Sequence, residues 1–126
     1  MQPQLFPLIV LSSLIVSANA SAAGPSGPGA LDGSYTSSGK SAEGKKFSGR
    51  VTLKRVENSY TVTWHASGEK GIGVLHDEHL VVAYQGKSWF GIIIYTIQRN
   101  RRLVGRFIPY GGKGKFGTET LEPEDP

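Results

Sequence analysis

The sequence contains no cysteine, and this absence excludes several chemistries at once. Disulfide bonds, thiolate metal sites and a cysteine nucleophile all require that side chain. Acylation of a cysteine directly after an apolar leader, the route by which bacterial lipoproteins are anchored, is excluded as well. The fold must therefore be held together by buried apolar surface, and a domain of about 100 residues can bury enough for this.

Charge is also absent from the first twenty residues. Within them, residues 5–16 form an apolar run that has the length of a signal-peptide core and is too short to span a bilayer of about 30 Å. Small residues at alternate positions follow, so a signal peptidase could cut after Ala20 or after Ala22. We predict that 1–20 is a signal peptide and that the product is periplasmic or extracellular, without a transmembrane anchor. The alternative is that 5–16 forms a buried strand or an uncleaved anchor.

Three further segments follow from composition. Residues 21–32 are rich in glycine, proline and serine and offer little apolar surface, so we expect a flexible tether whose deletion up to Leu31 leaves the stability unchanged. Residues 123–126 are acidic and contain proline, which predicts a frayed tail. The remaining residues, 33–122, form one domain that carries most of the positive charge of a chain with a formal net charge of +4.

No window of this domain shows a sustained helical period, whereas polar and apolar residues alternate over short segments that end in turn-forming residues. The fold class is therefore all-β. A tight turn at Glu57-Asn58 gives the clearest hairpin, with Asn58 adopting the positive φ. Short sequential hairpins predict an up-and-down antiparallel meander that closes into a small barrel. The eight expected strands are residues 33–37, 46–56, 59–66, 71–75, 79–84, 89–98, 102–108 and 116–121.

The period of two assigns faces to these strands. Tyr60, Val62 and Trp64 share a face that should point inward. In residues 89–98 both faces are apolar, so one of them must meet another protein surface, a loop or the tether. Several glycines fall inside strands, where they mark bulges, strong coiling or close backbone approach. These glycines are Gly49, Gly71, Gly73, Gly91, Gly105 and Gly117.

Short motifs along the domain resemble a family of small exported bacterial all-β proteins, largely uncharacterised, of which some members are labelled fibronectin-binding. The chain differs from that pattern at Phe107, where the family has Trp, and at Arg99, Arg101 and Arg102, where the family has a turn richer in Asp and Gly. The resemblance implies the same fold and no catalytic residue. The motifs that carry it are residues 47–53, 60–64, 71–73, 80–84, 103–105 and 117–121, together with Gly91 and Tyr95.

Residues that could perform chemistry are few. His76 and His79 enclose two carboxylates and could hold a divalent metal, but a short polar tip is typical of any solvated turn. Catalytic triads are assembled in space and not in sequence, so spacing does not test for one, and no nucleophile-elbow pattern supports one. Residues 111–115 resemble a phosphate-binding loop, yet a strand and not a helix follows them. We therefore assign no catalytic residue, metal or cofactor.

Glu119 lies in the middle of the last expected strand, between Gly117 and Leu121. It could face solvent. It could instead point inward, in which case it would need a partner such as Arg106, because a buried charge must be paired. The sequence leaves both orientations open.

Basic residues are dense in the second half of the domain and lie among aromatic residues, a pattern that suits an anionic partner. The candidate ligand-binding residues are Arg99, Arg101, Arg102, Arg106, Lys113 and Lys115. Nucleic acid is not expected as the partner of an exported protein. We expect a non-enzymatic binding module that contacts anionic polysaccharide, lipid headgroups or a matrix protein, or that holds a small ligand in its barrel. The alternative is a small secreted enzyme, such as a hydrolase, on the same scaffold.

Overall fold

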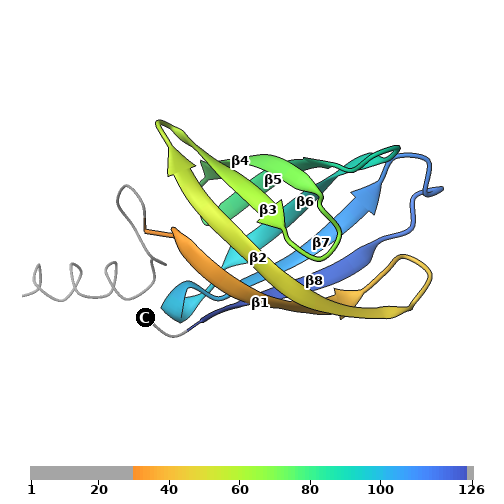
Figure 1. Ribbon diagram of the computed structural model, residues 1–126, viewed down its shortest axis with the longest axis horizontal. Helices are drawn as coiled ribbons and strands as arrows, with labels where there is room; N and C mark the ends of the chain where they lie inside the picture. Colours follow the sequence, from red (N-terminus) through yellow and green to blue (C-terminus); the bar gives the residue numbers. More distant parts are fainter. Residues whose placement is uncertain (1–29, 125–126) are drawn as a thin grey trace, which may run out of the picture.

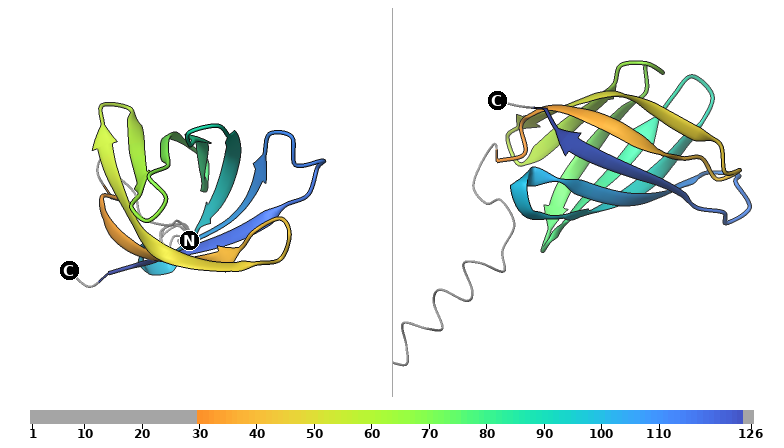
Figure 2. Two further views of the ribbon diagram at one scale, coloured as in Figure 1. Left: turned by 45° about the vertical axis from the view of Figure 1, so that its right-hand side comes forward. Right: turned by 90° about the horizontal axis from the view of Figure 1, so that it is seen from below.

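A computed structural model describes residues 30–124, and the expected signal peptide lies outside this range. Eight antiparallel strands follow one another around a closed barrel, and β1 pairs with β8 to complete it (Figures 1 and 2). The predicted all-β meander and its closure are confirmed. The strands are β1 Gly33–Lys40, β2 Lys46–Val56, β3 Ser59–Trp64, β4 Lys70–His76, β5 His79–Gln85, β6 Phe90–Ile97, β7 Leu103–Pro109 and β8 Gly117–Pro123.

The barrel has two different ends. We call one the mouth end; it carries the connections 41–45, 65–69, 86–89 and 110–116. We call the other the closed end; it carries the connections 57–58, 77–78 and 98–102 together with the start of β1 and the end of β8. In Figure 1 the closed end lies to the left and the β1–β2 and β7–β8 tips of the mouth end lie to the right. No helix in residues 30–124 is long and apolar enough to cross a membrane.

Alternating side chains fill the closed half of the barrel. Tyr60, Val62 and Trp64 point inward as predicted, and the other strands supply further buried apolar residues to the same core. On β6, Ile93 and Tyr95 are buried while Ile92 and Ile94 lie on the outer surface, about half exposed. Both faces of β6 are apolar, as expected, and within the described residues nothing covers the outer one.

The domain begins earlier than the sequence indicated. Leu31, assigned above to the tether, is only 1% exposed and belongs to the core. Its carbonyl oxygen accepts a hydrogen bond from the Tyr35 hydroxyl at 2.7 Å. The Asp32 side chain accepts a bond from the backbone N–H of Arg55 at 2.7 Å. Leu31 thus plugs the closed end, and the expectation that deletion through Leu31 leaves stability unchanged must be corrected.

At its C-terminal end, the folded domain also extends beyond the expected boundary at residue 122. Pro123, which we expected in the frayed tail, ends β8, and the backbone N–H of Glu124 donates to the carbonyl oxygen of Ser34 at 2.9 Å. The carboxylate of Glu124 forms an ion pair with Arg50 at 3.2 Å. The folded domain therefore reaches from Leu31 to Glu124.

Strand glycines make room for large side chains inside the barrel. A Cβ on Gly105 would lie 2.6 Å from the ring of Tyr95, and a Cβ on Gly117 would overlap the ring of Phe107. Each glycine lies directly opposite that aromatic residue on the neighbouring strand. At these two positions, the glycine allows the close approach of an aromatic side chain from the neighbouring strand.

Turn geometry differs from the expectation in one detail. In the β2–β3 hairpin the left-handed residue is Glu57, with φ 55°, and not Asn58. The β6–β7 connection contains a short 3-10 helix, η1, at Arg99–Arg101, in which Asn100 has φ 60°. Asparagine tolerates this conformation better than most residues because its short polar side chain can bond to nearby backbone.

Candidate ligand site in the barrel mouth

The basic residues proposed from the sequence do not form one site. Arg99, Arg101 and Arg102 lie in or beside η1 at the closed end, whereas Lys113 and Lys115 lie at the mouth end. Arg106 projects from the outer surface of β7, between the two ends.

Three of these arginines already have partners within the domain. Arg101 donates to the carbonyl oxygen of Asp32 at 2.7 Å, and its guanidinium lies 5.6 Å from the centre of the Tyr35 ring. Arg102 donates to the Glu122 carboxylate at 2.5 Å. The Arg106 guanidinium stacks over the ring of Phe116 at 4.1 Å. These contacts give Arg101 and Arg102 a structural role at the closed end.

Glu119 points into the barrel, which decides between the two orientations left open by the sequence. The residue is 3% exposed, and three donors from three other strands converge on its carboxylate. Ser37 of β1 donates to Oε2 at 2.5 Å, and the indole Nε1 of Trp64 on β3 donates to the same oxygen at 3.0 Å. The hydroxyl of Tyr95 on β6 donates to Oε1 at 2.5 Å.

The partner of Glu119 is therefore not an arginine. Arg106 lies on the outside of β7, and its neighbour across the ladder is Thr118 and not Glu119. Neutral donors take the place of the cation that the inward orientation was expected to require, because hydrogen bonds to a carboxylate can offset part of its desolvation.

Burial raises the pKa of Glu119 above its ordinary value of 4.5, and the hydrogen bonds from Ser37, Tyr95 and Trp64 act in the opposite direction. Burial likewise raises the pKa of Tyr95 well above 10, and the adjacent Glu119 charge adds to this rise. The Tyr95 hydroxyl consequently keeps its proton and remains a donor at neutral pH.

Above this carboxylate a cavity of about 560 Å³ opens toward the mouth end. Aromatic rings form much of its wall and meet edge to face. The ring centres of Phe47 and Phe107 are 6.1 Å apart, those of Phe107 and Tyr84 are 6.3 Å apart, and those of Tyr84 and Trp64 are 6.1 Å apart. Phe107 thus lies between Phe47 and Tyr84 in this aromatic wall.

The rim of the cavity joins two of the mouth-end connections. The indole N–H of Trp89, between β5 and β6, donates to the carboxylate of Glu69, between β3 and β4. Ser67 donates to the other oxygen of Glu69 at 3.0 Å. The aromatic ring of Trp89 and the Glu69 carboxylate therefore stand together at the entrance.

The charges that line the cavity are mainly negative. Its carboxylates are Glu43, Glu69 and Glu119, and among the described residues Arg50 is the one basic residue that lines it. The Arg50 guanidinium is paired with Glu124. The cavity is thus negatively charged within a chain whose net charge is positive.

Histidine chemistry lies outside this cavity. All three histidines fall in the described range, and His65 on the outer surface contacts the Thr52 hydroxyl at 2.7 Å. His76 and His79 are at the closed-end tip of β4–β5, where the His76 ring lies 3.7 Å from Asp77. Within residues 30–124, no group of three or more His, Asp or Glu side chains could hold a metal ion.

Sequence reasoning located part of this site. It identified Glu119 as unusual and Trp64 as inward-facing. It missed Ser37 and Tyr95 as partners of Glu119, although the alternation along β1 and β6 places both on inner faces. Barrel closure was predicted, but the register of the β1–β8 pairing was not, and this register brings Ser37 and Glu119 together across 82 positions of sequence.

The fold and this cavity define a small, closed, eight-stranded barrel that is packed at one end and hollow at the other. Comparisons with protein-family models, with curated proteins and with solved structures found no match to this chain.

Proposed function

We propose that the domain is a non-enzymatic binding protein that takes a small organic cation into the mouth of its barrel. The observation that carries this proposal is the buried carboxylate of Glu119, held by three donors at the floor of an open, aromatic-walled cavity. The ligand would place its apolar body against the aromatic wall and its cationic group toward Glu119.

Size and shape support a ligand of this kind. Small-molecule sites enclose about 300–1,000 Å³, are mostly apolar and contain a few convergent polar groups. The cavity, at about 560 Å³, falls in this range. Eight-stranded barrels of this architecture have an interior that side chains can fill or that can hold one small ligand.

Electrostatics favour a cation over an anion. A buried carboxylate without a cation in contact gains attraction when a positive ligand arrives, and the low local dielectric strengthens that attraction. Aromatic faces such as those of Trp64, Tyr84 and Phe107 also attract cations through their ring quadrupoles. An anionic ligand would instead meet Glu43, Glu69 and Glu119.

The enzymatic alternative has less support. Ser37 contacts a carboxylate, but a triad needs a histidine that accepts the serine proton, and His65 lies on the outer surface of the barrel. Export of the protein stays a prediction, because the leader residues lie outside the described range.

Isothermal titration calorimetry with three probes of one shape tests the proposal. We expect phenethylamine, which is a cation at neutral pH, to bind more tightly than neutral 2-phenylethanol, and phenylacetate to bind weakest. Glu119→Gln should remove most of the preference for the amine over the alcohol. Glu78→Gln, at an exposed tip of the closed end, is the matched control and should retain the preference.

Two results would contradict the proposal. One is a failure of all three probes to bind. The other is the same order of affinities in wild type and Glu119→Gln, since Glu119 would then have no part in recognition. Native mass spectrometry of the purified protein gives an independent measurement, in which a retained amine would support the proposal.

A further inference from the structure

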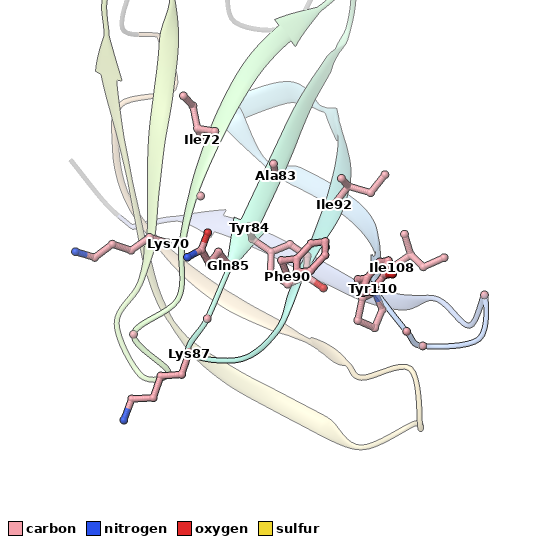
Figure 3. A pocket seen from close by; sticks show the side chains of 18 of the residues that line it. Lys70, Ile72, Ala83, Tyr84, Gln85, Lys87, Phe90, Ile92, Ile108 and Tyr110 are labelled. Atoms are coloured by element: carbon pink, nitrogen blue, oxygen red, sulfur yellow. The ribbon is translucent and has the colours of Figure 1, made fainter.

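The outer face of strands β4–β7 exposes apolar residues that have no part in the cavity. Outward-pointing residues of neighbouring strands form an apolar row there: Ile72 of β4 faces Ala83 of β5, Ala83 faces Ile92 of β6, and Ile92 faces Ile108 of β7. Figure 3 shows these four side chains one after another across the sheet. We call this surface the apolar face.

The isoleucines of the apolar face are well exposed to solvent. Ile72 is 56% exposed, Ile92 is 48% exposed, and a second row adds Val74 and Ile94 at similar exposure. Contiguous exposed apolar surfaces of this kind mark sites that bind a protein or a membrane.

Two aromatic rings extend the apolar face toward the mouth end. Phe90 and Tyr110 stack with ring centres 4.6 Å apart, and Tyr110 is 75% exposed. Aromatic rings with a polar tip, such as tyrosine, are enriched at the boundary between hydrocarbon and water. Figure 3 shows this pair beside Ile108.

Positive charge surrounds this mouth-end part of the face. A groove at this part of the face is lined by Lys70, Lys87 and Lys113. No carboxylate is among the described residues that line it. Asp77 and Glu78 lie at the opposite, closed-end tip of β4–β5, beyond Val74. Hydrophobic surface and positive charge therefore coincide at one edge of the barrel.

We propose that the apolar face docks on a bilayer surface rich in anionic lipid. The isoleucines, Phe90 and Tyr110 lie at the level of the headgroups and upper acyl chains, and the three lysines contact anionic headgroups. An apolar surface rimmed by basic side chains is the chemistry by which proteins lie on anionic membranes, since each nearby lysine or arginine adds attraction to the negative surface potential.

Charge complementarity favours lipid over a second copy of this chain. In a symmetric dimer that packs the apolar faces mouth end against mouth end, the two sets of Lys70, Lys87 and Lys113 would face one another, and like charges at an interface are unfavourable. In the antiparallel arrangement the three lysines would lie toward the closed-end tip of the other copy, whose described residues offer only the two carboxylates of Asp77 and Glu78. An anionic bilayer instead pairs with all three lysines at once.

The placement differs from the sequence-based expectation. That expectation put anionic contacts at Arg99, Arg101, Arg102 and Arg106 as well as at Lys113 and Lys115. Of these six residues, Lys113 lines the mouth-end part of the apolar face, and Arg106 borders the face beside Ile94 of the second row. The inference is independent of the proposed cation site, which opens inside the barrel.

Vesicle co-sedimentation tests the inference. Wild-type protein should bind vesicles of phosphatidylglycerol and phosphatidylcholine, and binding to pure phosphatidylcholine should be far weaker. The variant with Lys70, Lys87 and Lys113 all changed to Gln should bind the mixed vesicles less tightly by on the order of a hundredfold. Ile72→Ser with Ile92→Ser should also lose binding, while circular dichroism shows the folded barrel retained.

The β1–β2 hairpin offers a matched control. Changing Lys40, Lys45 and Lys46 to Gln removes the same charge from exposed positions at the mouth end but on different strands, and binding should change by no more than about threefold. Equal losses in the two triple-lysine variants would overturn the inference, because net charge alone would then explain binding. So would an absence of vesicle binding, and sedimentation equilibrium showing a dimer that Ile92→Ser abolishes would identify a second copy as the occupant.

Discussion

Glu119 combines burial, charge and three neutral donors in one residue. A carboxyl group with a raised pKa binds its proton more readily in the folded state than in the unfolded chain. The free energy of unfolding therefore falls as the pH rises from the unfolded pKa, near 4.5, through the higher folded pKa. Ionisation of Glu119 thus reduces the stability of the fold, as expected for a binding group more than for a purely structural one.

We expect Glu119→Gln to abolish this part of the pH dependence. Urea unfolding of both proteins from pH 4 to pH 8 gives the difference in unfolding free energy at each pH, and other titrating groups cancel in that difference. The wild type should lose stability relative to the variant as the pH rises above 4.5. A difference that stays constant over this range would show that Glu119 titrates alike in the folded and unfolded states.

Gly105 tests how tightly the interior is packed. Its Cβ would lie 2.6 Å from the Tyr95 ring, so we expect Gly105→Ala to lower the unfolding free energy by about 1–3 kcal/mol. Gly49→Ala is the matched control, because a Cβ there meets its nearest atom, on Ala66, at 3.6 Å. Thermal or urea unfolding should show little change for the control, and similar losses in both variants would contradict the packing argument.

At the scale of elements, the sequence predicted the strands well because alternation and turn residues are local signals. All eight strands are present, and the largest difference is the end of β1, at Lys40 and not at Ser37. Leu31 escaped prediction because a single apolar residue in a glycine-rich segment carries no period. Its position depends on the hydroxyls of Tyr35 on β1 and Tyr60 on β3, which hydrogen-bond to the Leu31 backbone from strands that are not adjacent in the sheet.

The free energy of unfolding should therefore depend strongly on Leu31, although the residue lies in a glycine-rich segment. We expect Leu31→Ala to lower the unfolding free energy by about 2–5 kcal/mol, the usual range for a buried leucine. Ile72→Ala on the exposed outer face should have a much smaller effect. The comparison is made by urea unfolding, and equal effects in the two variants would place Leu31 outside the cooperative core.

The candidate site could be predicted only in part, because strand patterns are local whereas contacts between distant strands are not. Inward orientation follows from the period of two, which makes Trp64 and Glu119 identifiable one strand at a time. Their contact requires the tilt and stagger of a closed barrel, which no single strand encodes. The apolar face is the opposite case, because apolar residues on both sides of β6 predict, from the pattern of a single strand, a second surface that must meet something other than the core.

At the scale of the whole molecule, the two ends of the domain meet at the closed end. Glu124 bonds to Ser34, three positions after Leu31. We expect a circular permutant that joins Glu124 to Leu31 through a flexible linker of about six residues, with new ends between Glu43 and Gly44, to fold into the same barrel. Circular dichroism and thermal unfolding measure this.

A second permutant supplies the contrast. The same join with new ends between Thr118 and Glu119 interrupts β8 in the middle of its ladders with β1 and β7, so it should fail to fold cooperatively. If both permutants unfold like the wild type, continuity of β8 is not required for closure.

Because β1 pairs with β8, the cavity can form only when the chain includes its last strand. Ser37 comes from the first strand and Glu119 from the last, so the polar floor cannot assemble until nearly all of the domain has been synthesised. A chain cut short before β8 would carry the aromatic wall without its carboxylate and would leave the edges of β1 and β7 unpaired, ready to associate with other chains. Binding activity would then report directly on full-length, correctly closed protein and would be silent for every truncated form.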